Sequence, residues 1–408
     1  MGRPNILERP EGRKIRNWFQ GRDGELFALL KELVEIQSGS FHKAGVDAVG
    51  RAVARSAART SLAVEFVSRA GRGDHVIFRS PAAVNLRSAG SEAESAGPPR
   101  ILMVGHMDTV FPEDTDFRDY REEGETAYGP GVIDMKGGLA AGIFALKALD
   151  AAGLLDRLPA TFVFNSDEEI GSPSSLDLIA AEADRADLAL VFEAGGLNGD
   201  IVTGRKGNLS IRVDVHGKAG HAAFAGPDKA SAIAEIARKI LAVEALNDPE
   251  RGVTANAGTV EGGIGPNTVP DFACSRMDFR FVEPADQKRI AAAVEEIVTK
   301  NAVPGVTSAY TVASGRPSMP PTQGNRKLYR IFADIAEALG MTAPEEFRQG
   351  VSDANQIAAR GVPVIDGLGP VGAKDHSKDE YMIRKTLPER ALLTALGMAD
   401  LAVFGGWG

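Results

Sequence analysis

The feature that most constrains the fold is a buried apolar run that ends in polar residues, Ile101 to Asp108 (ILMVGHMD). Its uninterrupted apolar character predicts a strand covered on both faces, as in a parallel sheet. His106 and Asp108 then stand at the carboxyl end, the edge at which open α/β sheets bind ligands. A histidine followed two residues later by a carboxylate can form a metal ligand and the group that orients it, although an isolated pair is more often structural.

Further segments end in acids in the same manner. Glu168 and Glu169 follow the apolar run 160–166, Glu193 follows the run 187–192, and Asp134 follows a Gly/Pro turn and precedes an Ala-rich helix. Each acid alone is typical of a solvated turn. Together with His106 they indicate a site at one edge of a sheet.

The second half of the chain has a different pattern. Strands and two long helices alternate over residues 209–313 in the order βαββαβ, which is typical of a ferredoxin-like unit. The helices and the strand that follow are expected to complete the first sheet. We therefore predict an α/β fold with a mixed, mostly parallel sheet flanked by helices, formed by residues 1–208 and 316–408, and an inserted ferredoxin-like α+β domain at 209–315.

Local patterns give further expectations near the start of the chain. The first residues are interpreted as a polar leader, and apolar residues at a period close to 3.6 predict helices at Gly24–Gln37 and Val46–Ala58. The segment Ala82–Pro99 is rich in Ser, Ala, Gly and Glu and is interpreted as an exposed loop.

Composition excludes several classes of function. The formal net charge of -9 argues against a nucleic-acid partner, and no apolar run approaches the roughly 18 residues of a membrane span. The charged start lacks the apolar core of a secretory signal, so a cytoplasmic location is expected. The single cysteine, Cys274, excludes an internal disulfide and a cysteine-rich zinc site, so a bound metal would need His, Asp and Glu.

The polar residues at the strand ends suit a pair of divalent cations. Such a site needs about three protein ligands per ion, with one carboxylate shared. His106, Asp134, Glu169 and Glu193 supply four donors, and His376 in the polar loop GAKDHSKDEY supplies the fifth. Imidazole and carboxylate without thiolate favour Zn²⁺, with Mn²⁺ and Co²⁺ as alternatives.

At this point the chain closely resembles the M20 family of metallopeptidases, and within it the glutamate carboxypeptidase type. The matching stretches occur in the family's order and are GHMDTVFP (105–112), YGPGVIDMKGG (128–138), FNSDEEIGS (164–172), VFEAG (191–195), KAGHA (218–222), GRP (315–317), SDAN (352–355) and DHSKDEY (375–381).

The resemblance implies a role for each donor. Asp134 would bridge two zinc ions, His106 and Glu193 would hold one ion, and Glu169 and His376 would hold the other. Asp108 would orient His106. The family also implies that the two parts at 1–208 and 316–408 form the catalytic domain, and that the inserted domain acts as a lid and makes a homodimer.

Catalytic and substrate-binding residues follow from the same motifs. A carboxylate that is not bound to metal can take a proton from water and pass it to the leaving nitrogen, and Glu168 is the candidate for this base. The resemblance assigns oxyanion stabilisation to His221 of the partner subunit, and substrate binding to Arg316, Arg280 and Asn267.

We expect a two-zinc hydrolase that cleaves an amide next to a free carboxylate and releases a C-terminal amino acid, with a peptide or an N-acyl amino acid as its small-molecule substrate. GSPSS after the acidic turn and GVSDANQI depart from the carboxypeptidase pattern, so an N-acyl-amino-acid deacylase of the same fold, a deacetylase or desuccinylase, is the alternative. A catalytically inactive metal-binding regulatory protein is a remote alternative. The other histidines, His42, His75 and His216, are interpreted as structural or surface residues.

Overall fold

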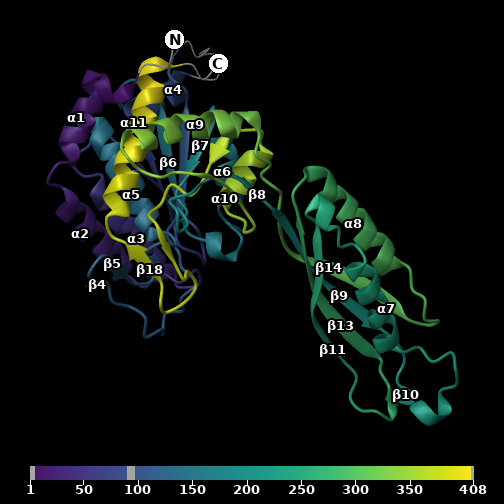
Figure 1. Ribbon diagram of the computed structural model, residues 1–408. Coiled ribbons are helices and arrows are strands. Elements are labelled where there is room, and N and C mark those ends of the chain that lie inside the picture. Colours follow the sequence, from purple (N-terminus) through teal and green to yellow (C-terminus); the bar gives the residue numbers. More distant parts are fainter. Residues whose placement is uncertain (1–4, 90–96, 406–408) are drawn as a thin grey trace. The chain divides into compact units, whose positions relative to one another are not determined.

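The chain forms two compact units in the computed structural model, which describes residues 5–89 and 97–405 (Figure 1). The first unit comprises the described residues of 1–204, 321–347 and 352–408. The second comprises residues 205–320 and 348–351. The range 209–315, expected to be an inserted domain, falls within the second unit.

A six-stranded sheet forms the centre of the first unit. Its strands, in spatial order, are β1 (Ala63–Val67), β2 (His75–Arg79), β6 (Ala160–Asn165), β3 (Ile101–His106), β7 (Leu188–Val191) and β16 (Val364–Ile365). The last four are parallel to one another, and β1 and β2 are antiparallel to their neighbours. Every residue of β3 is buried, which explains its uninterrupted apolar sequence. The predicted mixed, mostly parallel sheet is confirmed.

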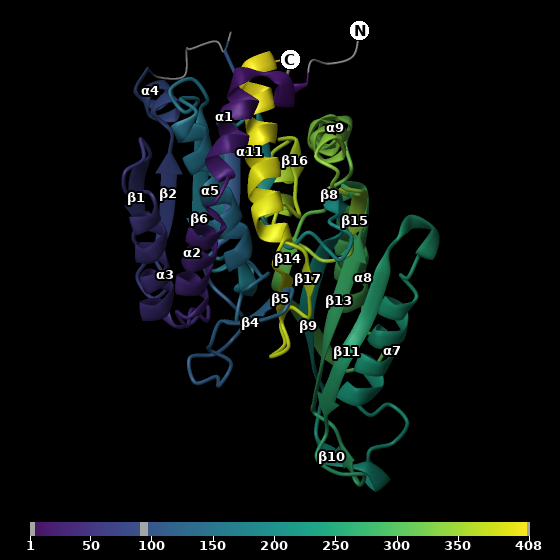
Figure 2. The same cartoon turned by 60° about the vertical axis from the view of Figure 1, so that its left-hand side comes forward.

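Helices cover both faces of this sheet. They are α1 (Pro10–Phe19), α2 (Asp23–Val34), α3 (Lys43–Ser56), α4 (Pro81–Ala89), α5 (Lys136–Ala151), α6 (Leu176–Ala183), α9 (Gln323–Ala338), α10 (Asp353–Ala359) and α11 (Thr386–Phe404). The crossover from β3 through α5 to β6 runs across the sheet in the opposite direction to the crossover from β6 through α6 to β7. Since both crossovers are expected to be right-handed, α5 and α6 belong on opposite faces. Helices α1, α2 and α11 pack around α5 (Figure 2).

The first unit also contains a small antiparallel sheet, which the sequence analysis did not predict. Its strands, in spatial order, are β17 (Gly372–Ala373), β18 (Tyr381–Ile383), β5 (Thr126–Tyr128) and β4 (Arg121–Glu123). Tyr128 pairs with Tyr381. This register sets the turn after β5 beside the turn before β18, although some 250 residues separate them in the chain.

The second unit is a four-stranded antiparallel sheet with two helices. Its strands, in spatial order, are β11 (Thr254–Gly262), β13 (Phe272–Phe281), β9 (Gly207–His216) and β14 (Thr307–Arg316), and its helices are α7 (Ala232–Glu244) and α8 (Pro284–Thr299). Both helices contact the sheet through a shared apolar core. The chain order β9-α7-β11-β13-α8-β14 confirms the predicted ferredoxin-like pattern. Two pairs of short strands complete the fold, β10 (Gly220–His221) with β12 (Thr268–Val269), and β8 (Ile201–Arg205) with β15 (Glu345–Arg348).

The interpretation of Ala82–Pro99 as an exposed loop was wrong at its start, where α4 forms. Ser80 precedes this helix, and its hydroxyl accepts a hydrogen bond from the backbone N–H of Ala83 at 3.2 Å. Pro81 occupies the first helical position, where its missing N–H costs nothing. The dipeptide Ser80-Pro81 before an Ala-rich stretch is therefore the sequence signal that indicates the start of this helix. Residues 90–96 of the expected loop lie outside the described residues.

The polar leader was also misinterpreted, because it contains α1. Ile15 and Phe19 of this helix are buried against the core while charged residues occupy its other face. In such a short amphipathic helix the few apolar positions are enough to dock it. Within the described residues, no helix combines the length and the apolar character that crossing a membrane requires.

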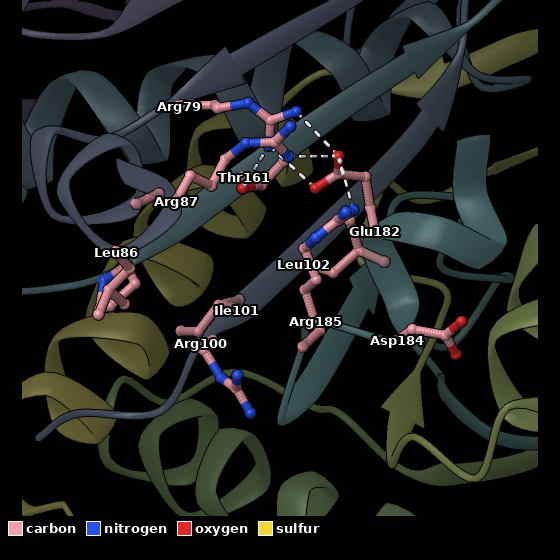
Figure 3. Close-up of a pocket in the computed structure, with 13 residues that line it drawn as sticks. Arg79, Leu86, Arg87, Arg100, Ile101, Leu102, Thr161, Glu182, Asp184 and Arg185 are labelled. Atoms are coloured by element: carbon pink, nitrogen blue, oxygen red, sulfur yellow. Dashed lines mark hydrogen bonds and ion pairs between the residues drawn. The ribbon is translucent and has the colours of Figure 1, made fainter. Parts of the chain in front are cut away.

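A pocket of ≈ 440 Å³ lies at the amino edge of the central sheet and is built around one buried ion pair (Figure 3). Arg79 donates hydrogen bonds to both carboxylate oxygens of Glu182 on α6, at 2.9 and 2.8 Å, and Arg87 on α4 donates to one of them at 2.9 Å. The side chains of Arg79 and Glu182 are each 6% exposed. None of the residues that line the pocket belongs to the predicted metal site, so we assign this cluster a structural role that ties α4 and α6 to β2.

We predict that Glu182→Gln lowers the free energy of unfolding at pH 7 by about 3 kcal/mol, because it leaves the buried Arg79 without an ionised bidentate partner. Burial raises the pKa of Glu182, but the hydrogen bonds and charges of Arg79 and Arg87 outweigh it, so the pKa is lowered in the folded protein. The stabilisation is therefore present above the carboxyl's ordinary pKa and is lost as the pH falls below it, and the difference from the wild type should shrink below about pH 4.

Urea unfolding at pH 7 and at lower pH measures this difference. Glu337→Gln, on the exposed side of α9, is the matched control and should leave stability unchanged. Equal unfolding free energies for Glu182→Gln and the wild type at pH 7 would contradict the structural role.

Candidate metal and active site

His106, at the end of β3, and Asp134, in the turn after β5, lie together at the carboxyl edge of the sheet. Nε2 of His106 is 3.1 Å from Oδ1 of Asp134 and 3.9 Å from Oε1 of Glu193. Nδ1 of His106 is 3.0 Å from the backbone carbonyl oxygen of Asp108, to which it can donate. This hydrogen bond selects the tautomer in which Nε2 carries a lone pair directed at the acids, as cation binding through Nε2 requires.

His376 lies on the other side of the same carboxylate. Its Nε2 is 3.1 Å from Oδ2 of Asp134 and 3.4 Å from Oε2 of Glu169. The two oxygens of Asp134 therefore face two different histidines, each of which is close to a second acid. This is the arrangement of a carboxylate that can be shared between two cations.

Asp108 holds the acidic turn that follows β6. Its Oδ1 accepts the backbone N–H of Glu168 at 3.2 Å, and its Oδ2 accepts the N–H of Glu169 at 3.3 Å and the hydroxyl of Ser40 at 2.7 Å. Its Oδ1 is also 3.4 Å from Nδ1 of His106. The carboxylate of Asp108 thus contacts both the acidic turn and the imidazole of His106. The shorter contact to the imidazole comes from the main-chain carbonyl oxygen of Asp108.

The serines that depart from the family's usual pattern support the same turn. Asp167 accepts hydrogen bonds from the backbone N–H of Ser174 at 2.5 Å and from the hydroxyl of Ser175 at 2.6 Å. Ser172 donates to Asp353 of α10 at 2.6 Å. The stretch GSPSS therefore acts here as a set of donors that fixes the acidic turn to its surroundings.

The partly buried acids of the site have shifted pKa values. Burial raises the pKa of Glu193 well above its ordinary value and also raises that of Glu169. For Asp134 burial acts in the same direction, but hydrogen bonds and charges from His106 and His376 outweigh it and lower the pKa. Hydrogen bonds to Asp134 and Glu169 raise the pKa of His376 to about 11. The electrostatics of the site therefore favour positive charge among these acids, and divalent cations could supply it.

The donor set fits such cations. Three donor atoms, from His106, Asp134 and Glu169, lie within 4.8 Å of one another, and so do those of Asp134, Asp375 and His376. Oε1 of Glu169 is buried and has no hydrogen-bond partner within residues 5–89 and 97–405, so it offers a lone pair to a ligand. Sequence reasoning missed Asp375, although it stands next to His376 in an acidic loop.

Glu168 begins a short 3-10 turn, Glu168–Ile170, and is half-buried beside Glu169. Adjacent residues of such a turn point in different directions. One can therefore bind a cation while the other meets a water molecule at the same site.

The four remaining predicted residues belong to the second unit and form two groups. Asn267 accepts the backbone N–H of Ala222 at 2.9 Å through its main-chain oxygen, and it directly precedes β12, whose first residue pairs with His221. Arg280 and Arg316 are both cross-strand neighbours of Asn208, at the start of β9.

The two groups lie at opposite ends of this sheet. His221 follows the end of β9, a strand of 10 residues, so the groups are separated by roughly 30 Å. One chain's second unit therefore does not gather all four residues at one place. His221 and Asn267 are exposed, Arg280 is half-buried with its Nε donating to Asp278 at 2.8 Å, and Arg316 is buried.

Comparisons with known proteins identify the family of the chain and its relatives. Residues 102–396 match the Peptidase family M20/M25/M40. The chain is 30% identical over 392 residues to carboxypeptidase G2 of Pseudomonas sp. (strain RS-16), covering 94% of this chain and 91% of that protein. It is 28% identical over 296 residues to succinyl-diaminopimelate desuccinylase of Corynebacterium glutamicum, covering 69% of this chain and 76% of that protein.

Solved structures show the same fold. Aminopeptidase PepT from Bacillus cereus superposes with a TM-score of 0.74 at 21% identity, covering 93% of this chain and 99% of that one. An M20 family metallo-carboxypeptidase from Sulfolobus solfataricus superposes with a TM-score of 0.69 at 17% identity, with the same coverage of 93% and 99%. The resemblance seen in the motifs is thereby confirmed, and the chain belongs to the M20 family of metallopeptidases, hydrolases that act on carbon–nitrogen bonds.

Proposed function

We propose that this protein is a two-zinc hydrolase that cleaves an amide bond next to a free carboxylate and releases a C-terminal amino acid. The observation that carries the proposal is the position of Asp134, whose two oxygens face His106 and His376 at 3.1 Å each. In this assignment Glu193 completes the ligands of one ion together with His106. Glu169 completes those of the other together with His376.

Bound zinc would supply Lewis-acid chemistry, because it lowers the pKa of water and polarises the substrate carbonyl. The chain's own contribution is proton transfer and positioning. Glu168 would take the proton of the attacking water and deliver it to the leaving nitrogen. Asp108 would fix the position of this base relative to His106, because it accepts the backbone N–H of Glu168 and also contacts His106.

The likeness to carboxypeptidase G2 favours a carboxypeptidase reaction here. The resemblance of the motifs to the glutamate carboxypeptidase type makes glutamate the first candidate for the released amino acid. Arg316 is proposed to bind the free carboxylate, because a guanidinium can pair with both carboxylate oxygens. Arg280 and Asn267 are proposed to assist in substrate binding.

A desuccinylase or another N-acyl-amino-acid deacylase is the second candidate, favoured by the likeness to succinyl-diaminopimelate desuccinylase. Both reactions use the same metal site and differ in the acyl group they accept. Rates on a panel of N-acyl-glutamates, N-acetyl-arginine, N-succinyl amino acids and dipeptides decide between them. A preference for N-succinyl substrates would replace the carboxypeptidase assignment.

Homodimerisation through the second unit and a cytoplasmic location are parts of the same proposal. In the second unit Leu241 on α7 is 71% exposed and Val260 on the edge strand β11 is 59% exposed. An edge strand beside a helix that exposes apolar side chains is a surface on which a second copy can pair. Since His221 lies at the far end of this unit's sheet from Arg316, a partner subunit is the proposed source of the oxyanion donor.

We predict that Glu168→Gln retains two metal ions per chain but loses at least 100-fold in kcat, because the amide cannot accept a proton from water. Metal content by plasma emission spectrometry and steady-state kinetics measure the two effects. Glu346→Gln serves as a control because it makes the same substitution at a half-buried glutamate of another element, β15. Two bound ions together with an unchanged kcat would rule out Glu168 as the base.

We predict that Arg316→Ala raises KM for substrates with a free carboxylate roughly tenfold or more, because it removes a charge-assisted hydrogen bond of about 1.5–3 kcal/mol. Substrate amides should show a much smaller effect. Arg276→Ala, an exposed arginine of the same sheet, is the control. If KM for the carboxylate substrates stays the same in Arg316→Ala, this residue does not bind the carboxylate.

A further inference from the structure

Glu380 is a buried acid that the proposed mechanism does not use. It is 0% exposed and stands four residues after His376 in the loop before β18. Its carboxylate accepts three backbone N–H groups of the turn that carries Asp134. Oε2 accepts that of Gly131 at 2.9 Å, and Oε1 accepts those of Ile133 at 2.9 Å and Asp134 at 3.2 Å.

The small antiparallel sheet explains how Glu380 reaches this turn. Tyr128, the last residue of β5, pairs with Tyr381, the first residue of β18. The residues that follow Tyr128 and the residue that precedes Tyr381 are therefore neighbours. Gly131 has a φ of +75°, which glycine adopts without strain, and it turns its N–H towards the carboxylate.

Only a carboxylate satisfies these three donors. Both oxygens of Glu380 act as acceptors, whereas a glutamine would place an NH₂ group opposite at least one backbone N–H. The donors are buried, so each one left without a partner would cost about 1–3 kcal/mol or force the turn to move. The backbone position of Asp134 thus depends on the shape of this side chain and on the placement of its two acceptor oxygens.

The same loop also supplies His376, whose Nε2 faces Oδ2 of Asp134 at 3.1 Å. Residues 374–380 are closed by hydrogen bonds from the N–H of Ser377 to the carbonyl of Lys374 and from the N–H of Glu380 to the carbonyl of Ser377. The same turn therefore contributes His376 to the site and, through Glu380, binds the backbone of Asp134, which faces His376.

We propose that Glu380 is a positioning residue that fixes the carboxylate of Asp134 between the two cation positions and couples it to His376. This role rests on the proposed two-ion function. The DHSKDEY segment would then have two roles: His376 would bind a cation, and Glu380 would position Asp134. Glu380 itself touches neither substrate nor the reacting atoms.

The test is the affinity for metal ions of the full-length Glu380→Gln protein. Cobalt ions are titrated into metal-free protein against a competing chelator, and the visible absorption of bound Co²⁺ reports the coordination geometry of each ion. We expect the affinity for the more weakly bound ion to fall about 10–100-fold, as is usual when a group that orients a ligand is removed, with an altered Co²⁺ spectrum. The loss of kcat should be partly reversed at higher metal concentration, and KM should change little.

Asp379→Asn is the matched control, because it removes one negative charge from the adjacent residue. Asp379 is 73% exposed and contacts Lys374 at 3.4 Å rather than the turn at 129–134. Its metal affinities and Co²⁺ spectrum should equal those of the wild type. Glu380→Asp is a second variant that keeps the carboxyl group but withdraws both oxygens by one methylene, and it too should weaken binding of one ion.

The outcomes separate the two claims. If the wild type binds two ions and either folded Glu380 variant binds them with unchanged affinity and spectrum, the positioning role is overturned while the proposed function stands. If the wild type binds fewer than two ions, the proposed function fails and the role of Glu380 fails with it. A variant that is less stable without metal, yet gains as much unfolding temperature from Co²⁺ as the wild type, has a structural defect only, which also overturns the role.

Discussion

The site depends on one carboxylate held between two imidazoles. Asp134 presents Oδ1 to His106 and Oδ2 to His376, and the partly buried Glu193 and Glu169 stand beside these histidines. Burying acids at this density is unfavourable unless positive charge accompanies them. The raised pKa values of Glu193 and Glu169 express this cost, and a pair of divalent cations would remove it. The same concentration of negative charge therefore favours the binding of metal ions at this place.

Two sheets position the residues of this site. The parallel strands β3, β6 and β7 bring His106, the acidic turn and Glu193 to one edge, as their direction requires. The small antiparallel sheet delivers Asp134 and His376 from distant parts of the chain through the pairing of β5 with β18. Around them, acceptors such as Asp108 and Asp167 bind backbone N–H groups, so that the turns that carry the proposed ligands are fixed without regular secondary structure.

The sequence predicted those parts of the structure that have a simple periodicity. The run Ile101–His106 and the order βαββαβ were recognised because burial on both faces and alternating elements leave plain patterns. The turn Gly129–Asp134 was placed near the site, but nothing local showed that Glu380 would grip it, because that contact follows from a three-residue strand pairing across the chain. Helix α4 was missed because its Ala, Ser and Arg residues resemble those of a loop, and its cap at Ser80 was overlooked. Asp375 was hidden among other charges of its loop.

The central claim is that two cations flank Asp134. X-ray diffraction from crystals of the zinc-loaded protein, with data collected on both sides of the zinc absorption edge, tests it most directly. The account predicts two anomalous peaks per chain, one beside each oxygen of Asp134, with His106 and Glu193 around the first and His376 and Glu169 around the second. A single peak, or peaks that do not contact Asp134, would contradict it.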